Sequence, residues 1–242
     1  MRLTMLSLDE LAKFLDRYFA IERFKDERGG VYRHSTRAIY RIGLALESWT
    51  QIEDWVNRER LDALFLHRPW QLELEQLKPD VGVVSYHLAF DEHLTLGFNP
   101  RLAEVLGIAN LEVLGEKEGR AIGMIGEILP ETFPSYCRYI HQVFGGQDTV
   151  YPGRCDRILR VAVVGAMTDE LVREAALRRA DVYITGQLRQ PAQNAVNETG
   201  IGVIAVGHRR CEEWGLRALA GVMRERWFGL EVILPPDEIL LH

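Results

Sequence analysis

The sequence has little of what membrane, secreted or zinc-finger proteins require. None of its apolar runs reaches the ~18 residues that a membrane-spanning helix needs. The N-terminus turns acidic at Asp9 and Glu10, too early for a secretory signal, so we expect a cytoplasmic protein with no membrane partner. Cys137, Cys155 and Cys211 have no metal-ligand spacing such as CxxC, and this sparse, odd count is typical of a reducing compartment.

Positive charge is also in deficit, because Lys and Arg number 29 against 35 Asp and Glu, for a net charge of −6. A nucleic-acid-binding domain normally presents a basic face, so this balance disfavours nucleic acid as a partner. Hydrophobic residues make up 47% of the 242, which is enough apolar content for one large core or two small ones.

What the chain does contain is an alternation of short apolar runs with helical periodicity. It is clearest in the last third, where strands at 158–164, 181–184 and 201–206 alternate with helices at 168–178 and 191–198. This alternation predicts βαβ units and a mainly parallel sheet, hence an α/β fold. A long helix at 210–227 and a strand at 231–234 are expected to close the chain.

The first half predicts similar elements. A helix over 7–19 begins with Ser7 and Glu10 in capping-box spacing. The polar stretch 25–35, with two adjacent glycines, is expected to be a loop, and 111–128 a hairpin. Four further elements are expected: a strand at 37–46, a helix at 50–59, and strands at 61–66 and 81–85.

Residues that bind divalent metal follow three of the predicted strands: His67, then His87 with Asp91, then His208 with Glu212. An α/β protein presents its functional groups at the carboxyl ends of its strands. Residues four apart lie on one face of a helix and can hold one ion. Because imidazole and carboxylate suit ions such as Zn, Fe or Mn, we predict a divalent-metal site with one or two ions per chain.

Roles other than metal binding are also open to these residues. A single His–x3–Glu pair is most often a surface pair, and only the three loops together favour a shared site. His87 is the candidate catalytic residue, as a proton shuttle or as a group that orients a ligand or water. Cys211, beside Glu212, is expected to be a buried packing residue.

Five segments also resemble the motifs of one family. His67-Arg68-Pro69 resembles "HHP", and 85–91 resembles "SxHTxxD". Further along, 160–165 resembles a Gly-ended strand, 180–186 resembles "aDvyiTG", and 206–212 resembles "GHyxxE". In this order the motifs are similar to those of the NGG-one-interacting factor three family, whose members are often named GTP cyclohydrolase I type 2 homologues.

The resemblance implies a fold of two intertwined α/β lobes with mixed, mainly parallel sheets covered by helices. It implies lobes at 1–108 and 109–242, with about 200–242 packing back to complete the metal site. It also implies self-association into a toroidal homohexamer, built as a trimer of dimers, with a dinuclear metal centre. By this resemblance one ion is held by His67, His208 and Glu212. The family's ligands for the second ion stand at the positions of Arg68, Asp91 and the shared Glu212.

Arg68 is the main departure from the family pattern, because it stands where the family has its second metal-binding His. A guanidinium is permanently charged and does not ligate a metal. We expect it either to pair with Asp91 in place of one ion or to contact an anionic group of the substrate. Leu88 and Gln187 also depart from the family's usual residues, Thr and an acid.

Three functions follow from these features. The first is a metal-dependent, hydrolase-like protein with an unknown small-molecule substrate, and whether it is an enzyme stays open. The second is a non-enzymatic, ring-forming binding or regulatory protein with a partly degraded metal site. The third, nucleic-acid binding inside a ring, rests only on arginine clusters such as Arg154, Arg157 and Arg160.

Overall fold

The computed structural model describes residues 5–25 and 29–236, and the chain divides into two compact units. The first unit combines 1–90 with 216–242, and the second is 91–215. The family resemblance implies a boundary between lobes at residue 108, whereas the structure divides the chain after residue 90 and again after residue 215. The C-terminal segment therefore belongs with the N-terminal one.

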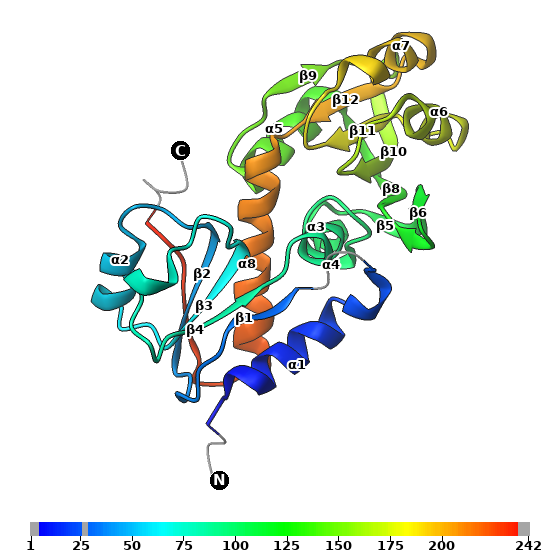
Figure 1. The fold of residues 1–242 in the computed structure, drawn as a ribbon. Helices are drawn as coiled ribbons and strands as arrows, with labels where there is room; N and C mark the ends of the chain where they lie inside the picture. The colour runs from blue at the N-terminus through cyan, green and yellow to red at the C-terminus, as the bar shows by residue number, and fades with distance from the viewer. Residues whose placement is uncertain (1–4, 26–28, 237–242) are drawn as a thin grey trace. The chain divides into compact units, whose positions relative to one another are not determined.

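The first unit is built on a five-stranded sheet in the order β1-β4-β3-β2-β13 (Figure 1). Four of its strands are parallel, and β1 pairs antiparallel with β4 at one edge. The strands are β1 (Gly30–Arg33), β2 (Arg41–Glu47), β3 (Ala63–Arg68), β4 (Gly82–Ser85) and β13 (Glu231–Ile233).

β1 corrects the expectation of a loop over 25–35. Gly29 and Gly30 both have positive φ, and their adjacency suggested a turn, but Gly30 already pairs with Ser85 of β4. Val31 and Tyr32 favour a strand, but β1 has only four residues, and pairing with β4 stabilises it.

Two helices cover opposite faces of this sheet, α1 (Leu8–Tyr18) and α2 (Ile52–Arg58), as Figure 1 shows. Gly82 faces α1, because a Cβ there would meet the side chain of Leu8. Gly43 faces α2, because a Cβ there would meet the ring of Trp55 at 2.5 Å. The predicted capping box of α1 is present, with Ser7 and Glu10 exchanging hydrogen bonds. Short 3-10 turns follow at Ile21–Arg23 and Leu74–Gln76.

The second unit contains a six-stranded mixed sheet in the order β5-β8-β10-β11-β12-β9. Its central strands β10, β11 and β12 are parallel, as predicted, and the other pairs are antiparallel. The predicted hairpin is present as β5 and β8, with the small β6–β7 ribbon between them. The strands are β5 (Ala109–Val113), β6 (Glu116–Lys117), β7 (Arg120–Ala121), β8 (Gly123–Thr132), β9 (Thr149–Tyr151), β10 (Arg157–Val164), β11 (Val182–Thr185) and β12 (Gly202–Ala205).

The remaining helices include one that the sequence did not predict, α3, which begins directly after the His87 position. In chain order the remaining helices are α3 (Leu88–Leu94), α4 (Pro100–Val105), α5 (Phe133–Phe144), α6 (Asp169–Leu177), α7 (Gln190–Thr199) and α8 (His208–Arg226). Helices α6, α7 and α8 match the helices predicted at 168–178, 191–198 and 210–227 within a few residues. The protein is therefore a mixed α/β protein, as expected. Within the described ranges, no helix combines the length and the apolar character needed to cross a membrane.

Candidate metal centre

His67 lies near the end of β3 with no exposed surface. Its ring packs 4.7 Å from that of Phe90, centroid to centroid. Its Nδ1 lies 3.1 Å from the backbone carbonyl of Tyr86. With Nδ1–H donating to that carbonyl, Nε2 carries the lone pair, which is the tautomer of a metal-binding histidine with its second nitrogen held by the protein.

His87 and Asp91 approach His67 from the segment after β4. His87 precedes α3 and Asp91 lies in its first turn, so both side chains are set by the start of one helix. The rings of His67 and His87 are 4.8 Å apart. One ligand atom each from His67, His87 and Asp91 lies within 4.8 Å of the other two. The division of the chain falls inside α3, between Phe90 and Asp91, and Asp91 follows His87 by four residues.

These three side chains fit a divalent ion. Two ligand atoms at about 2.0–2.2 Å from one ion are at most about 4.4 Å apart, so the observed spacing needs only small side-chain rotations. Two imidazoles and a carboxylate are a donor set for Zn, Fe or Mn. The sequence predicted His67 and Asp91 as ligands but gave His87 only a catalytic role; its place in the cluster makes it a candidate ligand as well.

His208 and Glu212 form a pair at the start of α8, in the second unit. His208 Nε2 lies 3.0 Å from Glu212 Oε1, and Glu212 is buried while His208 is exposed. The preceding Gly207 has φ +97, a conformation that glycine adopts without strain and that lets the helix begin at His208. The predicted spacing thus brings these two side chains together, and their binding of an ion stays a prediction.

Cys211 lies beside this pair and is a packing residue, as expected. Burial raises the pKa of its thiol well above the ordinary value, and the carboxylates of Glu212 and Asp91 raise it further. Its Sγ donates a hydrogen bond to the Gly207 carbonyl at 3.0 Å. A thiol in these surroundings stays protonated and is a poor nucleophile.

Arg68 follows His67 in the same strand and therefore projects to the opposite face of the sheet. Its Nη1 donates to Glu47 Oε1 at 2.8 Å, and the two residues are direct cross-strand partners between β3 and β2. The position that resembled a second metal-binding His thus holds a cation beside a carboxylate. The expected pair with Asp91 and the expected contact with an anionic substrate group stay predictions.

Two pockets adjoin these residues in the first unit. One, of about 300 Å³, is lined by His67 and His87 together with Tyr32, Trp70 and others from β1 and the end of β3. The other, of about 220 Å³, is lined by four residues: Glu47, Arg68, Trp70 and Gln71. Trp70 is shared by both pockets, and nothing in its local sequence indicated a functional role.

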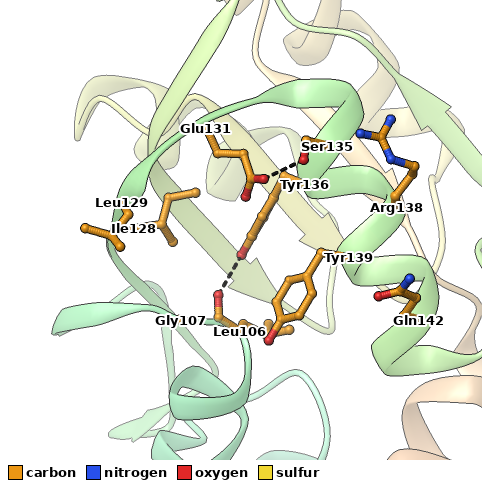
Figure 2. A pocket seen from close by; sticks show the side chains of 10 residues that line it. All are labelled: Leu106, Gly107, Ile128, Leu129, Glu131, Ser135, Tyr136, Arg138, Tyr139 and Gln142. Atoms are coloured by element: carbon orange, nitrogen blue, oxygen red, sulfur yellow. Dashed lines mark hydrogen bonds between the residues drawn. The ribbon is translucent and has the colours of Figure 1, made fainter.

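A larger pocket, of about 450 Å³, lies in the second unit between the end of α4, β8 and α5 (Figure 2). Ser135 donates to Glu131 at 2.5 Å, and the hydroxyl of Tyr136 donates to the Leu106 carbonyl at 3.3 Å. The described residues that line it include no histidine, cysteine or aspartate. Although this pocket is larger, its lining is therefore less suited to a metal ion than the cluster in the first unit.

Comparison with known proteins gives the same family that the motifs suggested. Residues 6–236 match the model of the family described as Duf34/NIF3 (NGG1p interacting factor 3). A protein named GTP cyclohydrolase 1 type 2 homolog from Neisseria meningitidis serogroup B is 30% identical over 193 residues, covering 74% of this chain and 76% of its own length. A protein of the same name from Pyrococcus abyssi is 28% identical over 242 residues, covering 93% and 96%.

Solved structures share the fold. The structure of TTHA1606 from Thermus thermophilus has a TM-score of 0.74 at 24% identity, with 95% of this chain and 97% of that chain covered. The protein ybgI, described as of unknown function, has a TM-score of 0.76 at 22% identity, with 95% and 98% covered. Because the family model spans nearly all of the chain, this protein belongs to the Duf34/NIF3 family.

Proposed function

We propose that this chain is a divalent-metal-binding, hydrolase-like protein that acts on a small molecule. The observation that carries the proposal is the grouping of ligand atoms from His67, His87 and Asp91 within 4.8 Å of one another. The donation of His67 Nδ1–H to the Tyr86 carbonyl supports it, because that bond orients the ring for a ligand role. His208 and Glu212 are the further ligands that the proposal includes.

A bound divalent ion supplies a Lewis acid, which polarises the bond to be cleaved and makes water a better nucleophile at neutral pH. The residues of the chain hold the ion and the substrate in place and exchange protons with them. Asp91 contributes negative charge, which favours a dication over a neutral ligand. The buried Glu212 carboxylate lies 3.0 Å from the exposed His208 ring and orients it for its proposed role as a further ligand, while His87 is the candidate proton shuttle.

The class of reaction is supported by the names of the relatives, which are homologues of GTP cyclohydrolase 1 type 2. A cyclohydrolase adds water to a ring carbon and breaks a carbon–nitrogen bond of the ring. We extend this reaction class, without a specific substrate, to the present chain. We also propose that it works in the cytoplasm as a homo-oligomer, a hexamer built as a trimer of dimers.

The test is the metal content of protein purified without an affinity tag after growth with added Zn, Fe and Mn. We expect one or two ions per chain and a higher melting temperature when Zn or Mn is restored to metal-free protein. His67→Ala should lower both, whereas His141→Ala, on the exposed surface of α5, should change neither. Less than a tenth of an ion per chain, with no change in melting temperature, would overturn the proposal.

A second candidate function is a non-enzymatic, ring-forming binding or regulatory protein. The observation in its favour is the pairing of Arg68 with Glu47 where the family pattern has a metal-binding His. It predicts at most one ion per chain and no metal-dependent hydrolysis of phosphoesters or of purine rings. Hydrolysis that is lost on chelation and restored by the metal would exclude it.

A further inference from the structure

Trp70 occupies an unusual place beside the candidate metal centre. Two thirds of its surface, 67%, is exposed, yet its ring lies 5.2 Å from the His87 ring and nearly perpendicular to it, at 80°. It is also the shared wall of the two first-unit pockets described above. A large aromatic side chain is thus kept in solvent next to the residues proposed to carry the chemistry.

The backbone holds Trp70 in this position. The amide of Leu72 donates to the carbonyl of Pro69 at 2.9 Å, which closes a four-residue turn with Trp70 and Gln71 at its centre. Leu72 is only 7% exposed and packs in the core against α2, and Pro69 directly follows β3. Because both ends of the turn are anchored, the backbone at Trp70 has little conformational entropy to lose on binding.

The surroundings of Trp70 define the kind of ligand. Tyr32, 43% exposed, lines the same pocket as His67 and His87, so two accessible aromatic rings border the space next to the cluster. On the other side of Trp70, Oε1 of Glu47 accepts from Arg68, the remaining lone pairs of that carboxylate can accept from a ligand, and the amide of Gln71 both donates and accepts. A flat ring with donors and acceptors on one edge matches both features.

We propose that Trp70 is the stacking platform for a substrate with a flat heteroaromatic ring, such as a purine nucleoside, and that Glu47 and Gln71 contact the polar edge of that ring. The inference rests on the proposed function, because the pocket holding His67 and His87 would receive the bond to be hydrolysed. Trp70 is a positioning residue in this account, and it acts by holding the ring rather than by taking part in bond cleavage.

The experiment measures the binding of guanosine and of adenosine to wild type, Trp70→Ala, Trp70→Phe and Phe228→Ala by equilibrium dialysis, with ribose as the ring-free probe. Phe228 is an aromatic residue with 98% exposure that lines neither first-unit pocket, so it controls for the loss of an exposed ring. The metal content of each variant is measured in parallel.

We expect at least one nucleoside to bind wild type and Phe228→Ala equally, and Trp70→Ala about fivefold or more weakly, since stacking on an aromatic side chain contributes that much per base. Trp70→Phe should retain most of the affinity, ribose should not bind, and wild-type metal content should persist throughout. Equal binding by Trp70→Ala would overturn the inference, as would failure of both nucleosides to bind the metal-loaded protein. Loss of metal in Trp70→Ala would also overturn it, because Trp70 would then support the ion site. Absence of metal in wild type would instead contradict the proposed function.

Discussion

Tyr86 offers a sharp test of how the first unit is held together around His67. Its side chain has no exposed surface, and its ring stacks on Phe65 at an angle of 9°. Its hydroxyl donates to Asp16 Oδ1 at 2.6 Å, with the Ala12 carbonyl at 3.2 Å, both on α1. The Tyr86→Phe substitution removes this link between α1 and the end of β4 while keeping the ring and the backbone carbonyl that orients His67.

The cost of the substitution follows from the partner that is lost. A hydrogen bond to a charged group contributes about 1.5–3 kcal/mol, and the phenyl ring leaves no large cavity, so we expect Tyr86→Phe to lower the free energy of unfolding by that amount. Tyr183→Phe is the matched control. Tyr183 is also fully buried, but its hydroxyl donates to a neutral carbonyl, that of Ala166, at 2.8 Å, so about 0.5–1.5 kcal/mol is expected.

Both variants are compared with wild type by urea unfolding in the presence of a chelator, so that metal binding does not add to stability. The free energy comes from the midpoint and slope of the transition, and the slope should not change. Metal affinity of Tyr86→Phe should stay within about twofold of wild type, because the carbonyl is retained. A loss of stability in Tyr86→Phe no larger than in Tyr183→Phe would refute the assigned bond to Asp16.

Three further predictions concern buried groups elsewhere. Burial raises the pKa of Tyr86, Tyr136 and Tyr183 above the ordinary range, so the folded state favours their neutral forms. Their full contribution to the free energy of unfolding is therefore present below about pH 10 and falls above it. Tyrosine absorbance should show these three side chains ionising only as the protein unfolds. Desolvation raises the pKa of all three thiols, that of Cys137 to about 11 and that of Cys211 well above its ordinary value. Because only Cys155 is exposed, a disulfide reagent at pH 8 should modify it first, and faster modification of either buried thiol would contradict the burial. Gly43→Ala should lower the free energy of unfolding by about 1–3 kcal/mol, because the added Cβ meets Trp55. Gly165→Ala should lower it little, because no atom lies nearer than 3.8 Å to a Cβ at that position. Equal losses of stability in thermal unfolding would show that the sheet adjusts to the added methyl group.

The sequence predicted the elements whose signals are local. The helix after Thr168 begins with a side-chain cap, and short apolar runs form β11, β12 and the second half of β10, at 161–164. The helix at α3 was missed because it has only seven residues and carries a His and two acids that read as a loop. β1 was missed because it has only four residues and follows two adjacent glycines, although Val31 and Tyr32 favour a strand, and its pairing with β4 stabilises it.

The site was predictable in its residue types but not in its grouping. In the parallel register of β3 and β4, Leu66 lies opposite Ser85, and this pairing sets His67 beside Tyr86 and His87. The register of β2 and β3 likewise sets Arg68 opposite Glu47. Such registers depend on pairing between distant segments, so the spacing of residues along one segment does not determine them. The involvement of Trp70 depends on the same registers, because its turn follows the carboxyl end of β3.

The central claim is that His67, His87 and Asp91 bind one divalent ion, and anomalous scattering from crystals grown with Zn tests it most directly. The account predicts a Zn peak about 2.0–2.2 Å from one atom of each of these three side chains, with His67 Nδ1 still bonded to the Tyr86 carbonyl. A map with no peak among them, or with Zn bound only at other residues, would contradict it.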